Sequence, residues 1–132
     1  MKKPKRLAES EWEIMNGVWD LGERVTVREV HTRLYPGGQK AYTTVQTTMN
    51  ILVEKGFLEK EKIGLVNFYT PTTSRDQAAH LATRTLVSRA FNGSFFALAN
   101  HLVDSGSLSA EDLAALRKTI QDREAAGSDG GR

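Results

Sequence analysis

Apolar residues recur at intervals of three and four along the first part of the chain, which is the spacing of one face of an α-helix. The pattern predicts three helices, over residues 9–20, 27–34 and 42–55. In the first, Trp12, Met15 and Trp19 share a side that we expect to face the core, with Val18 at its edge. The third ends at Gly56, the residue type expected just after a helix.

The pattern then changes to that of a β-hairpin. Charged residues alternate with others over residues 57–63, Gly64 marks a turn, and residues 66–70 predict the returning strand. Residues 25–27 are long enough only for a small strand. Helix, short strand, helix, turn, helix and hairpin follow one another as in the winged helix, a helix-turn-helix variant. Residues 1–73 are therefore expected to form a winged-helix domain.

The predicted helix over residues 42–55 carries short, uncharged polar side chains opposite its apolar face. Such side chains can hydrogen-bond to base edges in a DNA major groove: Asn and Gln with adenine, and Thr with its hydroxyl and methyl groups. The candidate base-reading residues are Thr43, Thr47 and Asn50, with Thr44 and Gln46 on the flanks. The alternative is a solvated helix face that is merely rich in threonine.

The second half of the chain predicts an all-helical module. Helices are expected over residues 74–91, 95–103 and from 109, with Ser94 capping the second and an S-x-x-D start at Ser109 opening the third. Three short helices make a poor core alone, so we expect a second copy to cover their apolar residues; an intrachain bundle is the alternative. The candidate dimer-interface residues are Leu81, Leu86, Phe91, Phe95, Phe96, Leu98, Leu102, Leu113, Leu116 and Ile120. Dimerisation is assigned to residues 74–124, and residues 125–132 predict a disordered tail.

Composition and charge narrow the functional classes. The chain has 132 residues, a net charge of +2 and no cysteine, which excludes disulfides and thiolate metal sites. Residues 1–75, which include the basic arm at 2–6, hold more Lys and Arg than Asp and Glu, whereas residues 76–132 hold slightly more acidic residues. That asymmetry favours a polyanion-binding first half. The basic start has no apolar segment, and no stretch is long enough to span a membrane, so a cytoplasmic protein is expected.

No constellation in the sequence indicates catalysis. The three histidines are scattered, with no metal-ligand spacing, and Gly37-Gly38 lacks the residues of a phosphate-binding loop. We therefore expect neither an enzyme nor a bound cofactor or metal.

Several runs of residues resemble those of the penicillinase repressors, the BlaI/MecI/CopY family. The similarity lies in E-W-x-x-M-x-x-x-W from Glu11, T-V-R-E-V from Thr26, A-Y-T-T-V from Ala41 and LSAEDLAALRKTI from Leu108, and it covers about residues 7–121. The resemblance implies a dimeric winged-helix repressor of β-lactamase or related cell-wall-stress genes. In β-lactam-responsive members it also implies release by a membrane-sensor-controlled protease that cuts an Asn-Phe bond, matched here by Asn100-His101. The alternative is that Asn100 is an ordinary helix residue and the repressor is released in another way.

This chain departs from the family pattern at three places. Ala8 stands where a threonine would often cap the first helix, so that helix start is expected to fray more. Leu65 stands at the hairpin tip, where an arginine commonly follows the glycine, and a leucine cannot bind a phosphate. His101 replaces the phenylalanine of the cleaved bond, and a protease that selects a large apolar side chain would bind imidazole poorly. The copper-sensing branch, which uses cysteines, is excluded.

Together these patterns predict a mainly α-helical protein with a small β-hairpin: a winged helix-turn-helix domain followed by a helical dimerisation domain. We expect a homodimer bound to double-stranded, inverted-repeat operator DNA, without membrane insertion. The expected phosphate-binding residues are Arg28, Lys40, Tyr42, Lys60 and Lys62. The alternative function is a winged-helix module that binds other proteins and has no specific DNA affinity.

Overall fold

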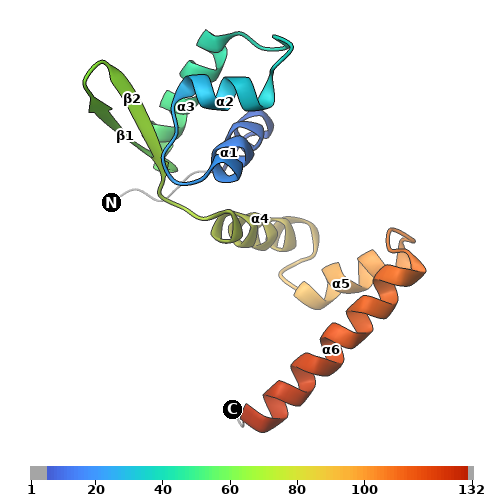
Figure 1. Ribbon diagram of the computed structural model, residues 1–132. Helices are drawn as coiled ribbons and strands as arrows, with labels where there is room; N and C mark the ends of the chain where they lie inside the picture. The colour runs from blue at the N-terminus through green and yellow to red at the C-terminus, as the bar shows by residue number, and fades with distance from the viewer. Residues whose placement is uncertain (1–5, 131–132) are drawn as a thin grey trace. The chain divides into compact units, whose positions relative to one another are not determined.

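The computed structural model describes residues 6–130, ordered as three helices, a β-hairpin and three more helices (Figure 1). The elements are α1 (Glu9–Leu21), α2 (Val27–Leu34), α3 (Tyr42–Lys55), β1 (Leu58–Ile63), β2 (Val66–Pro71), α4 (Arg75–Ala90), α5 (Phe95–Asp104) and α6 (Ala110–Gly130). This order confirms the predicted fold class. Residues 2–5 of the predicted basic arm at 2–6 lie outside the described residues.

The chain divides into two compact units, Met1–Ala82 and Thr83–Arg132. The predicted domain boundary at 73/74 therefore differs from the structural division, which falls inside α4. The difference has a local cause, because the first turn of α4 is held by α1: Arg75 bonds to Asp20 and Asn16 of that helix. Ala78, one turn further along α4, is also buried.

One apolar core holds the first unit together. It comprises Ile14, Met15, Val18, Val25, Val27, Val30, Tyr35, Val45, Met49, Leu52, Phe57, Leu58 and Tyr69. These side chains come from α1, α2, α3, the hairpin and the segments that join them, so the three helices and the wing, which lie together in Figure 1, share one core.

The prediction that Trp12 and Trp19 of α1 lie within the core is wrong. Trp19 is only half-buried and packs against the core from outside, and Trp12 is half-buried too. The two rings lie 6.1 Å apart. Val18, predicted at the edge of the apolar face, is instead fully buried. The reason is that both α2 and α3 pack on α1, which centres its buried face on Ile14, Met15 and Val18.

Backbone pairing attaches the hairpin to the helices. β1 and β2 are antiparallel, and Ile63 pairs with Val66 across the tip. The predicted small strand is a single bridge in which the Val25 and Tyr69 backbones exchange two hydrogen bonds, at 2.9 and 2.8 Å. Gly56 ends α3 with a φ of 89°, a left-handed conformation that glycine adopts without strain.

The start of α1 retains half of a capping box. Ala8 has no side-chain acceptor, but its backbone N–H donates to Glu11 Oε1 over 2.8 Å. Lys55 Nζ, from the end of α3, donates to the same oxygen over 2.7 Å. Burial by itself would raise the pKa of Glu11, but these two hydrogen bonds and the Lys55 charge lower it overall. Glu11 therefore anchors the helix start that the sequence predicted to fray.

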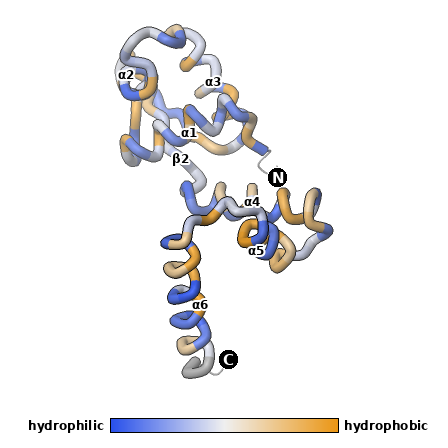
Figure 2. Tube along the Cα trace, turned by 90° about the vertical axis from the view of Figure 1, so that its right-hand side faces the viewer, coloured by the Kyte–Doolittle hydropathy of each residue, from blue (hydrophilic) through white to orange (hydrophobic). Residues whose placement is uncertain are grey.

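The second unit contains helices with little buried surface. Apolar residues concentrate along α5, whereas hydrophobic and hydrophilic residues alternate along α6 (Figure 2). Ser94 caps α5 by accepting from the Ala97 N–H, and Ser109 and Asp112 exchange the two bonds of a capping box at the start of α6. Both caps match the prediction.

The end of α6 differs from the predicted disordered tail. The helix continues to Gly130, whereas disorder was predicted from residue 125. Glu124, Ala125 and Ala126 are strong helix formers that carry the last turns past the glycine and serine that suggested disorder. Residues 131 and 132 lie outside the described residues.

Candidate nucleic-acid interface

Helix α3 presents its polar side chains away from the core of the first unit. Val45, Met49 and Leu52 are buried on the side of α3 that faces the core. The threonines predicted to read bases are on the outside: Thr43, Thr44 and Thr47 are exposed, and Gln46 is half-buried. The exposed side is therefore uncharged and able to donate and accept hydrogen bonds, which are the properties that base-edge recognition requires.

Asn50 lies on the polar side of α3, as predicted, but it already has hydrogen-bond partners within the protein. Lys60 Nζ donates to Asn50 Oδ1 over 2.9 Å, and the Tyr69 hydroxyl donates to the same oxygen over 3.0 Å. A bidentate contact with adenine needs this oxygen together with the amide nitrogen, so Asn50 is already committed within the protein. It joins α3 to both strands of the wing, and the sequence could not show this because its partners lie 10 and 19 residues away.

The same junction changes the role predicted for Lys60. Its ammonium points to Asn50 and lies 5.9 Å from the centre of the Tyr69 ring. Tyr69 is fully buried, and its burial raises the pKa of its hydroxyl. The charge of Tyr42 raises this pKa further, by a smaller amount. The hydroxyl is therefore a protonated donor. Both lysines of β1 are exposed; Lys60 contributes to this junction, while Lys62 points to no partner in it.

The other three predicted phosphate-binding residues gather at the start of α3. The Arg28 guanidinium lies 6.0 Å from the centre of the Tyr42 ring. Lys40 Nζ lies 3.3 Å from Glu13 Oε1 and 5.5 Å from the centre of the Tyr35 ring. The hydrogen bonds that Glu13 accepts from Tyr35 and Lys40 hold the pKa of its carboxyl below the usual range, so its negative charge persists beside Lys40.

His31 organises the turn between α2 and α3, a role that sequence reasoning missed. Its Nε2 lies 2.7 Å from the Lys40 carbonyl oxygen. Because a carbonyl only accepts, this nitrogen carries the proton and donates. The His31 ring also lies 6.1 Å from that of Tyr42. The histidine thus fixes the chain just before α3, where a helix-turn-helix protein approaches the backbone of DNA.

The wing has the apolar tip that the sequence predicted, and an arginine beside it that the sequence did not reveal. Leu65 is 94% exposed at the tip, beside the exposed Ile63 and Val66. Arg24, from the loop before α2, lies 5.4 Å from the centre of the Phe68 ring and 3.9 Å from Glu61. Arg24 therefore adds a cation to the wing through a contact between distant parts of the sequence.

The predicted dimer-interface residues are exposed or half-buried in a single chain. Phe91, Leu98 and Leu113 are half-buried. The exposed members are Leu81, Leu86, Phe95, Phe96, Leu102, Leu116 and Ile120. Asn100 and His101 are exposed residues of α5, with Asn100 Nδ2 3.4 Å from Asp104 Oδ2 and the His101 ring 5.5 Å from that of Phe91.

Residues 6–130 are the part of the chain that the structure describes. In this part of the chain no three His, Cys, Asp or Glu side chains come together as a metal site would require. No helix within the same residues is long and apolar enough to cross a membrane.

The fold and the exposed helix α3 define a winged helix-turn-helix protein, and comparisons with known proteins agree. The sequence profile of the penicillinase repressors matches residues 7–122. The transcriptional regulator BlaI of Mycobacterium tuberculosis is 32% identical over 126 residues, covering 95% of this chain and 90% of that protein. The penicillinase repressor of Bacillus licheniformis is 24% identical over 124 residues, covering 94% and 96%.

A solved structure is also similar, that of the monomeric form of Bacillus licheniformis BlaI in complex with the blaP half-operator. It is 29% identical, with a TM-score of 0.46, and covers 58% of this chain and 93% of that one. The family profile and the mycobacterial relative span nearly the whole sequence. The chain therefore belongs to the penicillinase repressor family, a family of transcriptional repressors and not of enzymes.

Proposed function

We propose that this protein is a homodimeric repressor that places α3 of each subunit in the major groove of an inverted-repeat operator. The observation that carries the proposal is the exposed, uncharged polar side of α3. Thr43, Thr44, Gln46 and Thr47 would contact base edges. Asn50 is withdrawn from that set, because its carbonyl oxygen already accepts two hydrogen bonds.

The cations around α3 suit the phosphate contacts that fix the register of such a complex. Arg28 and Tyr42 are neighbours at the helix start, and Lys40 lies in the turn before it. Lys62 and Arg24 extend the positive charge onto the wing. Leu65 at the tip supplies no charge, so the wing would bind through its cationic sides.

The apolar residues of the second unit support dimerisation. Phe96 is 76% exposed, Ile120 55% and Phe95 53%, all large apolar side chains of α5 or α6. Exposed apolar surface of this kind marks interaction sites in soluble proteins. A second copy would cover it and couple two half-sites on one DNA molecule.

The oligomeric part of the proposal is tested by sedimentation equilibrium of the full chain. Phe96→Glu should shift the dimer towards monomer, because it would bury a charge in an apolar interface. Leu65→Glu is the matched control: it places the same charge on a more exposed leucine of the wing and should leave the dimer intact. A wild-type chain that sediments as a monomer would refute the homodimer.

DNA binding is tested by incubating the purified protein with fragments of the source genome, followed by recovery and sequencing. The proposal predicts enrichment of a few promoter fragments that share an inverted repeat. It also predicts a gel shift that a scrambled fragment does not compete away. If no fragment is enriched, the alternative of a winged-helix module that binds other proteins is the better account.

Release of the repressor by proteolysis completes the proposal. The bond between Asn100 and His101 lies within α5. Cutting it would separate α6, which carries Leu113, Leu116 and Ile120, from the rest of the chain. We would expose the source bacterium to a β-lactam and follow the repressor by mass spectrometry. A fragment ending at Asn100 supports cleavage by a sensor-controlled protease, whereas an intact chain during full induction excludes it.

A further inference from the structure

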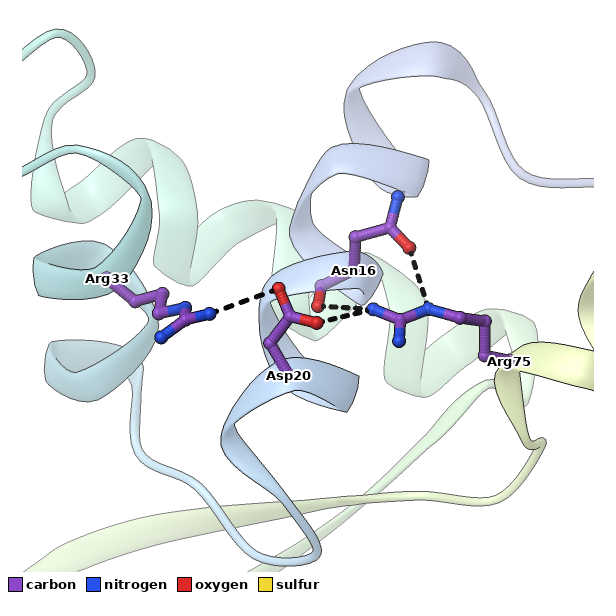
Figure 3. Close-up of polar contacts among 4 residues, drawn as sticks. All are labelled: Asn16, Asp20, Arg33 and Arg75. Atoms are coloured by element: carbon purple, nitrogen blue, oxygen red, sulfur yellow. Dashed lines mark hydrogen bonds and ion pairs between the residues drawn. The ribbon is translucent and has the colours of Figure 1, made fainter. Parts of the chain in front are cut away.

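Arg75, the first residue of α4, makes an unusually dense set of contacts with α1 (Figure 3). Its Nη2 donates to Asp20 Oδ1 over 2.7 Å and to the Asn16 carbonyl oxygen over 3.2 Å. Its Nε donates to Asn16 Oδ1 over 3.3 Å. The guanidinium carbon also lies 5.5 Å from the centre of the Trp19 ring. One planar side chain thus spans a full turn of α1.

Two further contacts extend this attachment. Trp19 Nε1 donates to the Thr73 carbonyl oxygen over 2.9 Å, which holds the segment just before α4. Arg33 of α2 approaches the other carboxylate oxygen of Asp20, Oδ2, at 3.4 Å (Figure 3). Asp20 therefore lies between an arginine from α2 and an arginine from α4. We call Asn16, Asp20, Arg33 and Arg75 the Asp20 cluster.

The Asp20 cluster is geometrically specific, although its members are partly exposed. A single exposed ion pair contributes little. Here, however, the guanidinium fork makes several bonds with fixed directions and stacks on an aromatic ring, which a lysine could not reproduce. The hydrogen bond from Arg75, followed by the charges of Arg75 and Arg33, holds the pKa of Asp20 below its usual range. The carboxylate is thus charged throughout the neutral range.

The position of the cluster along the chain suggests its role. α4 is one uninterrupted helix, Arg75–Ala90, and the division between the two units falls within it. Backbone hydrogen bonds join each turn of such a helix to the next. Whatever fixes the first turn of α4 on α1 therefore fixes the direction in which α4 starts from the winged helix.

We propose that the Asp20 cluster is a positioning device that sets the spacing between the two half-sites the dimer can bind together. This inference rests on the proposed function. Arg75 and Asp20 would act without touching DNA, through the direction in which α4 starts. With the cluster intact, the second winged helix reaches its half-site at high effective concentration only when the spacing is correct. When the cluster is broken, the winged helices should tolerate several spacings and bind each less tightly.

The test compares full-length wild type, Arg75→Gln and Arg84→Gln. Arg84→Gln is the matched control, since it makes the same change at an exposed residue of the same helix. The probes are the inverted-repeat fragment recovered from the source genome, the same fragment with one or two base pairs inserted between its halves, and a single half-site. Sedimentation and tryptophan fluorescence check association and folding.

Wild type and Arg84→Gln should lose on the order of tenfold or more in affinity when base pairs are inserted. Arg75→Gln should bind the single half-site like wild type and lose several-fold on the natural fragment. Its affinities for the different spacings should converge to within about threefold. Asp20→Asn, which weakens the cluster from the α1 side, should behave in the same way, while Arg75→Lys should retain part of the discrimination.

An Arg75→Gln dimer that keeps the spacing discrimination of wild type would overturn the inference while leaving the proposed function intact. Dissociation of the Arg75→Gln dimer would also overturn it, because the cluster would then act on association and not on spacing. If Arg75→Gln does not fold, Asp20→Asn decides by the same criteria. A wild-type protein that binds paired and single half-sites equally would instead refute the proposed function.

Discussion

The junction between α3 and the wing gives the sharpest prediction about stability. Asn50 Oδ1 accepts from Lys60 and from the Tyr69 hydroxyl, and Tyr69 has no exposed surface. Replacing Asn50 by Ala removes the acceptor of both donors. Lys60 is exposed and can bind water instead, whereas the buried hydroxyl of Tyr69 has no such replacement.

The structure sets the magnitude of each effect. Leaving a buried hydroxyl without a partner costs about 1–3 kcal/mol, so Asn50→Ala should lower the free energy of unfolding by that amount. Tyr69→Phe removes the hydroxyl itself and should cost only about 0.5–1.5 kcal/mol. In the double variant no hydroxyl remains to be left unpaired. Its cost should therefore fall short of the sum of the two single costs by roughly 1 kcal/mol.

Urea unfolding followed by tryptophan fluorescence measures these differences. The only two tryptophans of the chain, Trp12 and Trp19, both lie in α1, so the signal reports on the winged-helix unit. The four proteins are compared at one concentration, because dimerisation would contribute to the stability. If the double variant lost as much stability as the two single variants together, the hydrogen bond between Tyr69 and Asn50 would not contribute as described. Unchanged stability in Asn50→Ala, together with a changed base preference, would return Asn50 to base reading.

Three further predictions concern single residues. Glu11→Gln should cost about 1–3 kcal/mol at neutral pH. Because the pKa of Glu11 is lowered in the folded protein, the stability that its carboxylate contributes is present above the ordinary pKa of 4.5 and is lost as pH falls through the lowered pKa. Urea titrations at several pH values should therefore show that the free energy of unfolding falls less steeply with acid in the variant than in wild type. Gly17→Ala would place a Cβ 2.8 Å from Leu34 Cδ1 and should cost about 1–3 kcal/mol, whereas Gly127→Ala, with open space around it, should not destabilise. Lys40→Ala should weaken binding to all DNA sequences alike and lower the salt slope by about one unit, as salt-dependent binding assays can measure.

Local patterns in the sequence predicted most of the elements of the fold. Spacing of apolar residues placed the helices, and Gly56 and Gly64 marked the end of α3 and the hairpin turn, because these signals act within a few residues. The exposed threonines of α3 were predictable for the same reason. Periodicity assigns a residue to a face of its own helix and needs no knowledge of the partner.

Contacts between distant residues could not be predicted in this way. Asn50 lies on the polar side of α3 by its spacing, but its partners on the wing decide what it does. Arg75 appeared to be an ordinary residue of a helix start, and its partners on α1 lie 55 and 59 residues earlier. The half-buried Trp12 was misassigned to the core because α1 has a buried face centred on other residues.

In the proposed complex the exposed side of α3 reads bases while the cations beside it hold phosphates. The most direct test is to measure the affinity of the full-length protein for the recovered operator and for each of its single-base-pair substitutions. Thr47→Val, which removes one hydroxyl from the middle of the exposed side, should change the preference at one or two positions by about 1–3 kcal/mol. Arg28→Gln should weaken binding to every substituted operator by the same factor. If Thr47→Val also weakened all operators uniformly, or changed none, α3 would not be the helix that reads the sequence.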